Sequence, residues 1–165
     1  MGLKTERKIV KVAGSFKEVV TVKDEAGKVL HKIINPLMIT FRLKDVLQVI
    51  VGASILAIPV AFTEETWKLG ESLPLLNIIL LMALSLTFIS LFIYYNYYRE
   101  HLKEHWEEFT KRALSTYMIA FLVVALILTI IQMAPWSTDL LLAFKRIVLV
   151  AFPASMSGAV ADTIK

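Results

Sequence analysis

The chain contains no cysteine, and only 19% of its 165 residues are charged. The missing cysteine excludes disulfide bonds, cysteine-ligated zinc or iron–sulfur centres, and thiol nucleophiles. The low charge, together with a hydrophobic fraction of 57%, argues against an ordinary soluble domain. The basic residues are also unevenly placed, because ten of the eighteen lysines and arginines lie in residues 1–44. These counts indicate a polar N-terminal head followed by an apolar body.

Four apolar segments are long enough to cross a membrane as helices. A span needs about 20 mostly apolar residues to cross a hydrocarbon layer about 30 Å thick. The predicted spans are residues 45–63, 74–98, 113–134 and 139–164. We therefore predict an all-α membrane protein, a four-span transmembrane helical bundle with a small N-terminal cytoplasmic β-rich segment.

The polar residues 1–36 have the pattern of short β-strands. Residues 8–12 alternate, and residues 16–23 and 28–33 flank a four-residue turn typical of a hairpin. Three short strands make a marginal domain by themselves, so this head is expected to need support from the membrane surface, a second copy or a helical loop. Its lysines could bind anionic lipid, although a solvated surface is the favoured interpretation. The predicted domains are a cytoplasmic head, 1–36, and a transmembrane domain, 37–165.

The distribution of lysine and arginine predicts the orientation. Basic residues concentrate in the head and in the loop at 99–112, whereas the loop at 64–73 holds one and the loop at 135–139 holds none. Because basic loops stay on the cytoplasmic side, we predict a multi-pass protein of the cell membrane with both termini in the cytoplasm.

Lys145 and Arg146 do not fit this scheme simply, since both fall in the outer half of the last predicted span. In the favoured interpretation they extend to the outer surface from a continuous helix interrupted by Pro153. In the alternative, residues 137–146 lie flat in the membrane interface and the true span is shorter.

The string at 101–105 matches H-x-x-E-H, a metallopeptidase pattern. On a helix, one face would carry the possible metal ligands His101, Glu104, His105 and Glu108. A peptidase also needs a further ligand and a substrate cleft, and this string lies in a loop dense in both charges. The favoured interpretation is a solvated helix face, which predicts no catalytic residue and no cofactor. The alternative is a site for a divalent cation that regulates the protein or bridges an oligomer. Within this alternative, a catalytic metal is the least favoured case.

A pair of carboxylates, Glu64 and Glu65, follows the first predicted span. At a low-dielectric boundary such a pair could gather cations, and in a symmetric oligomer it would form a ring. The competing interpretation is a polar outer loop anchored by Trp67, with one of the two glutamates paired to Lys145 or Arg146. The sequence favours neither.

The last predicted span carries a stripe of small residues that ends in a carboxylate. At 100° per residue, Ser155, Gly158 and Asp162 fall on one narrow face. The favoured interpretation is close packing against another helix. The alternative is a pore wall whose cytoplasmic end carries Asp162, so that the three residues line or gate an ion path.

Two segments carry a family resemblance. Residues 52–67, GASILAIPVAFTEETW, and residues 151–162, AFPASMSGAVAD, resemble the signature stretches of a prokaryotic family of integral membrane proteins of unknown function. The resemblance implies a polytopic helical membrane protein and draws attention to Glu64, Glu65, Trp67, Pro153, Gly158 and Asp162. It implies no activity.

These patterns predict a homo-oligomeric ion channel or transporter rather than an enzyme. Cations are favoured because carboxylates lie near membrane depth, whereas an anion path would use Lys145 and Arg146. The expected partners are the lipid bilayer, further copies of the chain and inorganic ions, not nucleic acid. The alternative is a non-conducting adaptor or sensor whose head binds a cytoplasmic partner.

Overall fold

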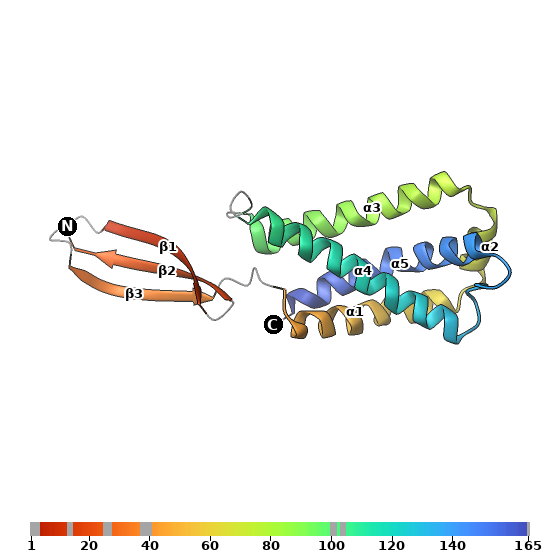
Figure 1. Ribbon diagram of the computed structural model, residues 1–165, viewed down its shortest axis with the longest axis horizontal. Coiled ribbons are helices and arrows are strands. Elements are labelled where there is room, and N and C mark those ends of the chain that lie inside the picture. Colours follow the sequence, from red (N-terminus) through yellow and green to blue (C-terminus); the bar gives the residue numbers. More distant parts are fainter. Residues whose placement is uncertain are drawn as a thin grey trace. The chain divides into compact units, whose positions relative to one another are not determined.

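The computed structural model describes residues 4–12, 15–24, 28–36, 41–99, 102 and 105–164. The chain divides into two compact units, an N-terminal unit up to Phe41 and a helical unit that begins at Arg42 (Figure 1). The two units are described separately.

The N-terminal unit, called the head below, is a three-stranded antiparallel sheet. Its strands are β1 (Lys4–Val12), β2 (Ser15–Lys23) and β3 (Val29–Pro36), in the order β1-β2-β3 (Figure 1). The pairing of β2 with β3 shifts between Val22 and Lys23. The prediction of a small β-rich N-terminal segment is therefore confirmed, although β1 begins four residues before the predicted strand.

The helical unit contains four helices that are long and apolar enough to cross a membrane. The elements are α1 (Leu43–Ala61), α2 (Glu64–Ser72), α3 (Leu75–Ile93) continued by a π-helical segment η1 (Tyr94–Tyr98), α4 (Trp106–Ile130) and α5 (Leu140–Thr163). The four candidate spans are α1, α3 with η1, α4 and α5, which confirms the predicted four-span helical protein. The short helix α2 occupies part of the predicted outer loop.

The boundaries of the third span differ from the prediction. The helix α4 begins at Trp106 instead of residue 113 and ends at Ile130. Glu107 and Glu108 in its first turn favour an early start because they face the positive end of the helix dipole. Its end comes just before Gln132, whose φ of 60° is incompatible with a continuing helix.

The helix α5 runs without interruption through Lys145, Arg146 and Pro153. Asp139 caps its start, since its side chain accepts a hydrogen bond from the Leu142 amide at 2.9 Å. The stretch 137–146 therefore does not form a separate segment ahead of a shorter helix.

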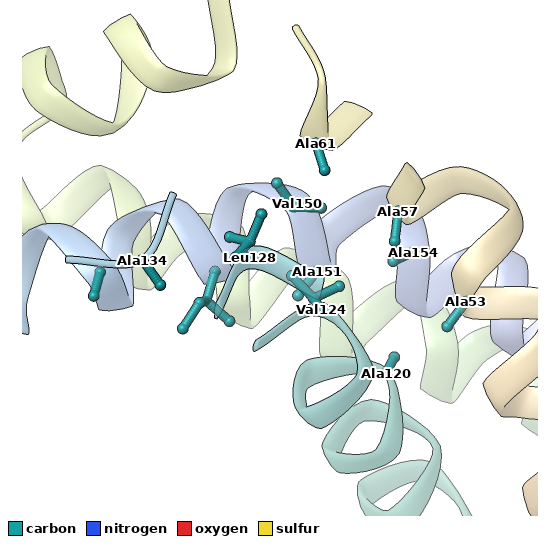
Figure 2. Close-up of a cluster of buried hydrophobic side chains, with 12 residues drawn as sticks. Ala53, Ala57, Ala61, Ala120, Val124, Leu128, Ala134, Val150, Ala151 and Ala154 are labelled. Atoms are coloured by element: carbon teal, nitrogen blue, oxygen red, sulfur yellow. The ribbon is translucent and has the colours of Figure 1, made fainter. Parts of the chain in front are cut away.

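The core of the helical unit consists mostly of alanine and other small side chains. Figure 2 shows Ala53, Ala57 and Ala61 of α1 directed toward Val150, Ala151 and Ala154 of α5, with α4 contributing Ala120, Val124 and Leu128. All nine are at most 1% exposed. Small side chains let helix backbones approach closely, and this is the usual way helices associate within lipid. The helix α5 contacts α1, α2, α3 and α4, and so lies at the centre of the bundle.

The two ends of the bundle can be told apart by what lies there. The start of α1 and the C-terminal end of α5 lie at one end, called the terminal end below, and α2 lies at the other (Figure 1). Since the four spans alternate in direction, the end of α3 and the start of α4 also belong to the terminal end.

Candidate functional site

A fully buried ion pair at the terminal end joins α4 to α5. The side chains of Arg112 and Asp162 are each 1% exposed. Two nitrogens of the Arg112 guanidinium, Nε and Nη2, donate to the same carboxylate oxygen of Asp162 at 2.9 and 2.6 Å. Burying two charges is costly, so such a pair survives only where each charge compensates the other.

The other two spans also reach this ion pair. From α1, the carboxylate of Asp45 lies 3.8 Å from Nη2 of Arg112 and is 13% exposed. From η1, the ring of Tyr97 lies under the guanidinium, 3.8 Å from its carbon to the ring centre. The Tyr97 hydroxyl donates to the backbone carbonyl of Asp162 at 2.9 Å. We call Asp45, Tyr97, Arg112 and Asp162 the charge cluster; each of its members comes from a different span.

The alternating direction of the spans explains why these four residues meet. Asp45 lies in the first turn of α1, where its carboxylate also accepts a hydrogen bond from the Arg42 amide at 2.9 Å. Arg112 lies near the start of α4 and Asp162 in the last turn of α5. Among the described residues, the charge cluster brings one guanidinium close to two carboxylates.

A second polar group ties α2 to α5 at the opposite end. Arg146 donates to Glu71 at 2.9 Å and to the carbonyl of Met133 at 2.9 Å, and its guanidinium lies 5.4 Å from the ring centre of Trp67. Lys145 donates to the carbonyl of Leu73 at 2.7 Å. Both basic residues therefore have partners in the loops and in α2, which explains how α5 carries two basic residues in its second turn.

The expected pairing of Lys145 or Arg146 with Glu64 or Glu65 does not form. The acidic partner of Arg146 is Glu71, seven residues further along α2 than Glu64. Glu64 instead pairs with Lys68, one helical turn away, at 2.8 Å. Both Glu64 and Glu65 are exposed in the first turn of α2. The sequence does not predict the Arg146–Glu71 pair, because residues 64–73 have the composition of a loop. The partner follows only from the helical spacing of α2, which brings Glu71 close to α5.

The small-residue stripe of α5 is packed inside the single chain. Ser155 is fully buried and shares a hydrogen bond of 2.7 Å with Ser85 of α3. A Cβ placed on Gly158 would lie 3.2 Å from Val49 of α1, so this glycine permits a close helix approach. Within one chain, the stripe is thus covered by helix packing and by the Arg112 pair.

Two of the four predicted metal ligands, His101 and Glu104, lie outside the described residues. His105 directly precedes α4, and Glu108 lies half-buried in its first turn. Within the described ranges, no three histidine, aspartate or glutamate side chains gather as a metal site would require.

The sequence reasoning missed Arg112 because it assigned this residue to a loop. The role of Arg112 can be inferred from the helical spacing if α4 begins at Trp106. Arg112 then shares a helix face with the buried residues Ala113, Thr116 and Ala120, and a charge on a buried helix face requires a partner.

The Arg146 contacts give a stability prediction. Arg146→Gln is expected to lower the free energy of unfolding in detergent by about 1–2 kcal/mol, because hydrogen bonds to Glu71 and Met133 are lost together. Thermal unfolding followed by tryptophan fluorescence measures this. The matched control is Lys68→Gln, whose exposed ion pair should contribute at most about 0.5 kcal/mol. Equal effects of the two substitutions would contradict the prediction.

Comparison with known proteins identifies the family. The family described as "Putative integral membrane protein (DUF2391)" matches residues 17–164, which is most of the chain. No match was found among curated proteins or among solved structures. The match agrees with the resemblance of the two signature segments and with the four candidate spans. The chain therefore belongs to this family of integral membrane proteins.

Proposed function

We propose that the protein is a homo-oligomeric ion channel or transporter that favours cations. The observation that carries the proposal is the charge cluster, in which the pair Arg112–Asp162 is fully buried beside a second carboxylate. Ionisable groups are expensive inside a membrane protein, and those found there commonly belong to ion pathways or proton relays. We place the protein in the cell membrane with both termini in the cytoplasm, where the basic residues of the head would lie.

The charge cluster suggests a two-state element. Arg112 contacts Asp162 closely and lies 3.8 Å from Asp45, so its guanidinium has two possible carboxylate partners. A proton or metal cation on Asp162 would compete with Arg112 for the carboxylate and weaken the Arg112–Asp162 contact. Arg112 would then favour Asp45, and the change of partner would shift α5 relative to α1. A ligand shifts such an equilibrium by its different affinity for the two states.

Because the stripe is buried within one chain, we propose that the resting path does not run along it. In this proposal, Ser155, Gly158 and Asp162 become accessible only after rearrangement, or the path runs between copies of the chain. The exposed Glu64 and Glu65 would gather cations at the outer mouth. Cations are favoured over anions because Glu64 and Glu65 are both exposed, Glu64 in a surface pair with Lys68. By contrast, the Arg146 side chain is 12% exposed and bonds to Glu71 and Met133, and Lys145 bonds to Leu73.

The test is ion flux across liposomes containing the purified protein. Potassium, sodium, calcium and chloride gradients are compared with empty vesicles, and reversal potentials under a salt gradient give the sign of the ion. We expect cation-selective flux that falls about ten-fold in Asp162→Asn. The matched control is Lys111→Gln, next to Arg112 but exposed, which should leave flux unchanged.

The absence of flux for every ion, from protein verified to be folded, would overturn the proposal. Unchanged flux in the double variant Glu64→Gln, Glu65→Gln would overturn the assignment of these two residues to the outer mouth.

The second candidate function is a non-conducting adaptor or sensor. It is favoured by exposed apolar side chains on the head sheet. Four apolar residues of β3, Val29, Leu30, Ile33 and Ile34, are 45–55% exposed. Deleting residues 1–35 separates the candidates, because an adaptor loses its activity whereas a channel keeps at least ungated flux. In both candidates the protein is proposed to be neither an enzyme nor the carrier of a resident cofactor.

A further inference from the structure

The two faces of the head sheet differ in chemistry. Successive side chains of a strand point to opposite faces, and directly paired residues of neighbouring strands share a face. The registers Lys8↔Val19↔Ile34 and Glu6↔Thr21↔Lys32 therefore define one face. Apart from Val29 and Leu30, which lie beside the register shift, its described side chains, here called the lysine face, are Glu6, Lys8, Val10, Lys17, Val19, Thr21, Lys23, Lys32 and Ile34. The described side chains of the other face are Val20, Val22, His31 and Ile33.

The lysine face carries a strong positive surplus, with four lysines against one glutamate. The glutamate is Glu6, which accepts a hydrogen bond from Lys23 at 2.6 Å, and this contact lowers the pKa of Glu6. Glu6 thus stays ionised at neutral pH and offsets a single lysine. The three other lysines, Lys8, Lys17 and Lys32, leave the face positive, and Lys8 and Lys32 are exposed.

Apolar side chains lie among these lysines. Val19 and Ile34 are directly paired across β2 and β3, and Ile34 is 55% exposed. Lys8 extends the same row on β1, while Lys17 and Lys32 lie on the neighbouring rows of the sheet. Surfaces that rest on membranes combine basic groups for lipid phosphates with apolar side chains that enter the headgroup layer.

The chain connects the head to a candidate membrane span through a short tether. Strand β3 ends at Pro36, and the membrane-spanning helix α1 begins at Leu43. The six intervening residues reach at most about 20 Å when fully extended. Such a tether gives the head a high effective concentration at the bilayer surface, so even a weak lipid interaction is populated.

We propose that the lysine face docks on anionic phospholipid headgroups of the membrane that α1 spans. The positive surplus supplies the attraction, and Val19 with Ile34 supplies apolar contact at the surface. This inference is independent of the proposed transport, since it concerns only the head and its tether.

Because the chain has no cysteine, one introduced cysteine can be labelled selectively in the 165-residue protein. Single-cysteine variants Ile34→Cys and Ile33→Cys are labelled with the same environment-sensitive fluorophore. The two positions are adjacent on β3, similarly exposed and on opposite faces, so Ile33→Cys is the matched control. Each labelled protein is placed in nanodiscs of phosphatidylcholine alone or with about 30% phosphatidylglycerol, and quenching by a water-soluble quencher is measured.

We expect about three-fold weaker quenching at position 34 than at position 33, only in the anionic nanodiscs. About 0.5 M salt should remove the difference, because the Debye length falls to a few ångström. Replacement of Lys8, Lys17 and Lys32 by glutamine should remove it as well. Equal quenching at both positions in anionic nanodiscs would overturn the proposal. Protection that is the same in neutral nanodiscs would also overturn it and would indicate a protein contact instead.

Discussion

Arg112→Gln is expected to destabilise the protein by about 3–5 kcal/mol, the largest stability loss of any single substitution considered. The substitution leaves Asp162 as a buried carboxylate, at 1% exposure, without the guanidinium that gives it two hydrogen bonds. It also removes the cation stacked on Tyr97. Denaturant or thermal unfolding in detergent measures the loss, and Lys111→Gln, which changes an exposed charge on the same helix, should change stability by at most about 0.5 kcal/mol.

A double variant shows whether the loss comes from the uncompensated charge that remains when only one member of the Arg112–Asp162 pair is replaced. Arg112→Met combined with Asp162→Leu removes both charges and keeps apolar volume in the site, so no buried charge is left uncompensated. Exchange of a buried ion pair for apolar side chains is commonly neutral or stabilising. We therefore expect the double variant to recover most of the stability lost in Arg112→Gln. A double variant as unstable as the single one would contradict our description of the pair as the source of the loss.

The second large effect is expected at Gly52 of α1, where α1 lies close to α5. A Cβ added here would lie 2.3 Å from the Cβ of Ala161 and 2.9 Å from the carbonyl oxygen of Ser157. Neither distance is tolerable, and the backbone oxygen cannot move aside as a flexible side chain would. Gly52→Ala is therefore expected to lower the free energy of unfolding by about 1–3 kcal/mol, with a larger loss for Gly52→Val.

The control for Gly52 adds volume on the outward side of the same helix. Val51 is 63% exposed, so Val51→Ile should change stability by at most about 0.5 kcal/mol. Gly158→Ala should lie between the two, because its Cβ would meet the Cγ1 and the carbonyl oxygen of Val49 at 3.2 Å each, contacts that are tight but longer than those at Gly52. Thermal unfolding in one detergent ranks the variants. A Gly52→Ala protein as stable as the parent would mean that α1 and α5 are further apart than described.

The sequence was sufficient for the number of spans and for the strands of the head. Each span has its own apolar signal of adequate length, and each strand has local alternation, so both predictions depend on neighbouring residues alone. The span boundaries were harder. The polar first turns of α4 resemble a loop in composition, yet Glu107 and Lys111 are spaced as an i,i+4 pair on a helix.

The charge cluster could be predicted only in part. Asp162 was identified from the sequence, because a carboxylate at the end of an apolar segment is conspicuous. Its partner was not, since Arg112 is 50 residues away and the pairing depends on how α4 and α5 are placed side by side. The same limit applies to the contact between Arg146 and Glu71, 75 residues apart. Composition indicates that a buried charge needs a partner, but only the tertiary packing selects which one.

The stripe of α5 illustrates a different limit. Small residues at helical spacing permit close packing and also permit a pore wall, and the sequence pattern is the same for both. In the single chain the stripe packs against Val49 and Ser85. The pattern therefore predicted correctly that a neighbour approaches this face, and the structure identified the neighbour as α1 together with α3.

The most direct test of the central claim is cation flux through the double variant Arg112→Met, Asp162→Leu in liposomes, compared with the parent protein and with empty vesicles. We propose that the Arg112–Asp162 pair is required for ion transport as well as for the stability of the helical bundle. We predict that the double variant unfolds at nearly the parent temperature and yet conducts no more than empty vesicles. Parental flux from the stable double variant would contradict the claim and would leave the pair a purely structural contact.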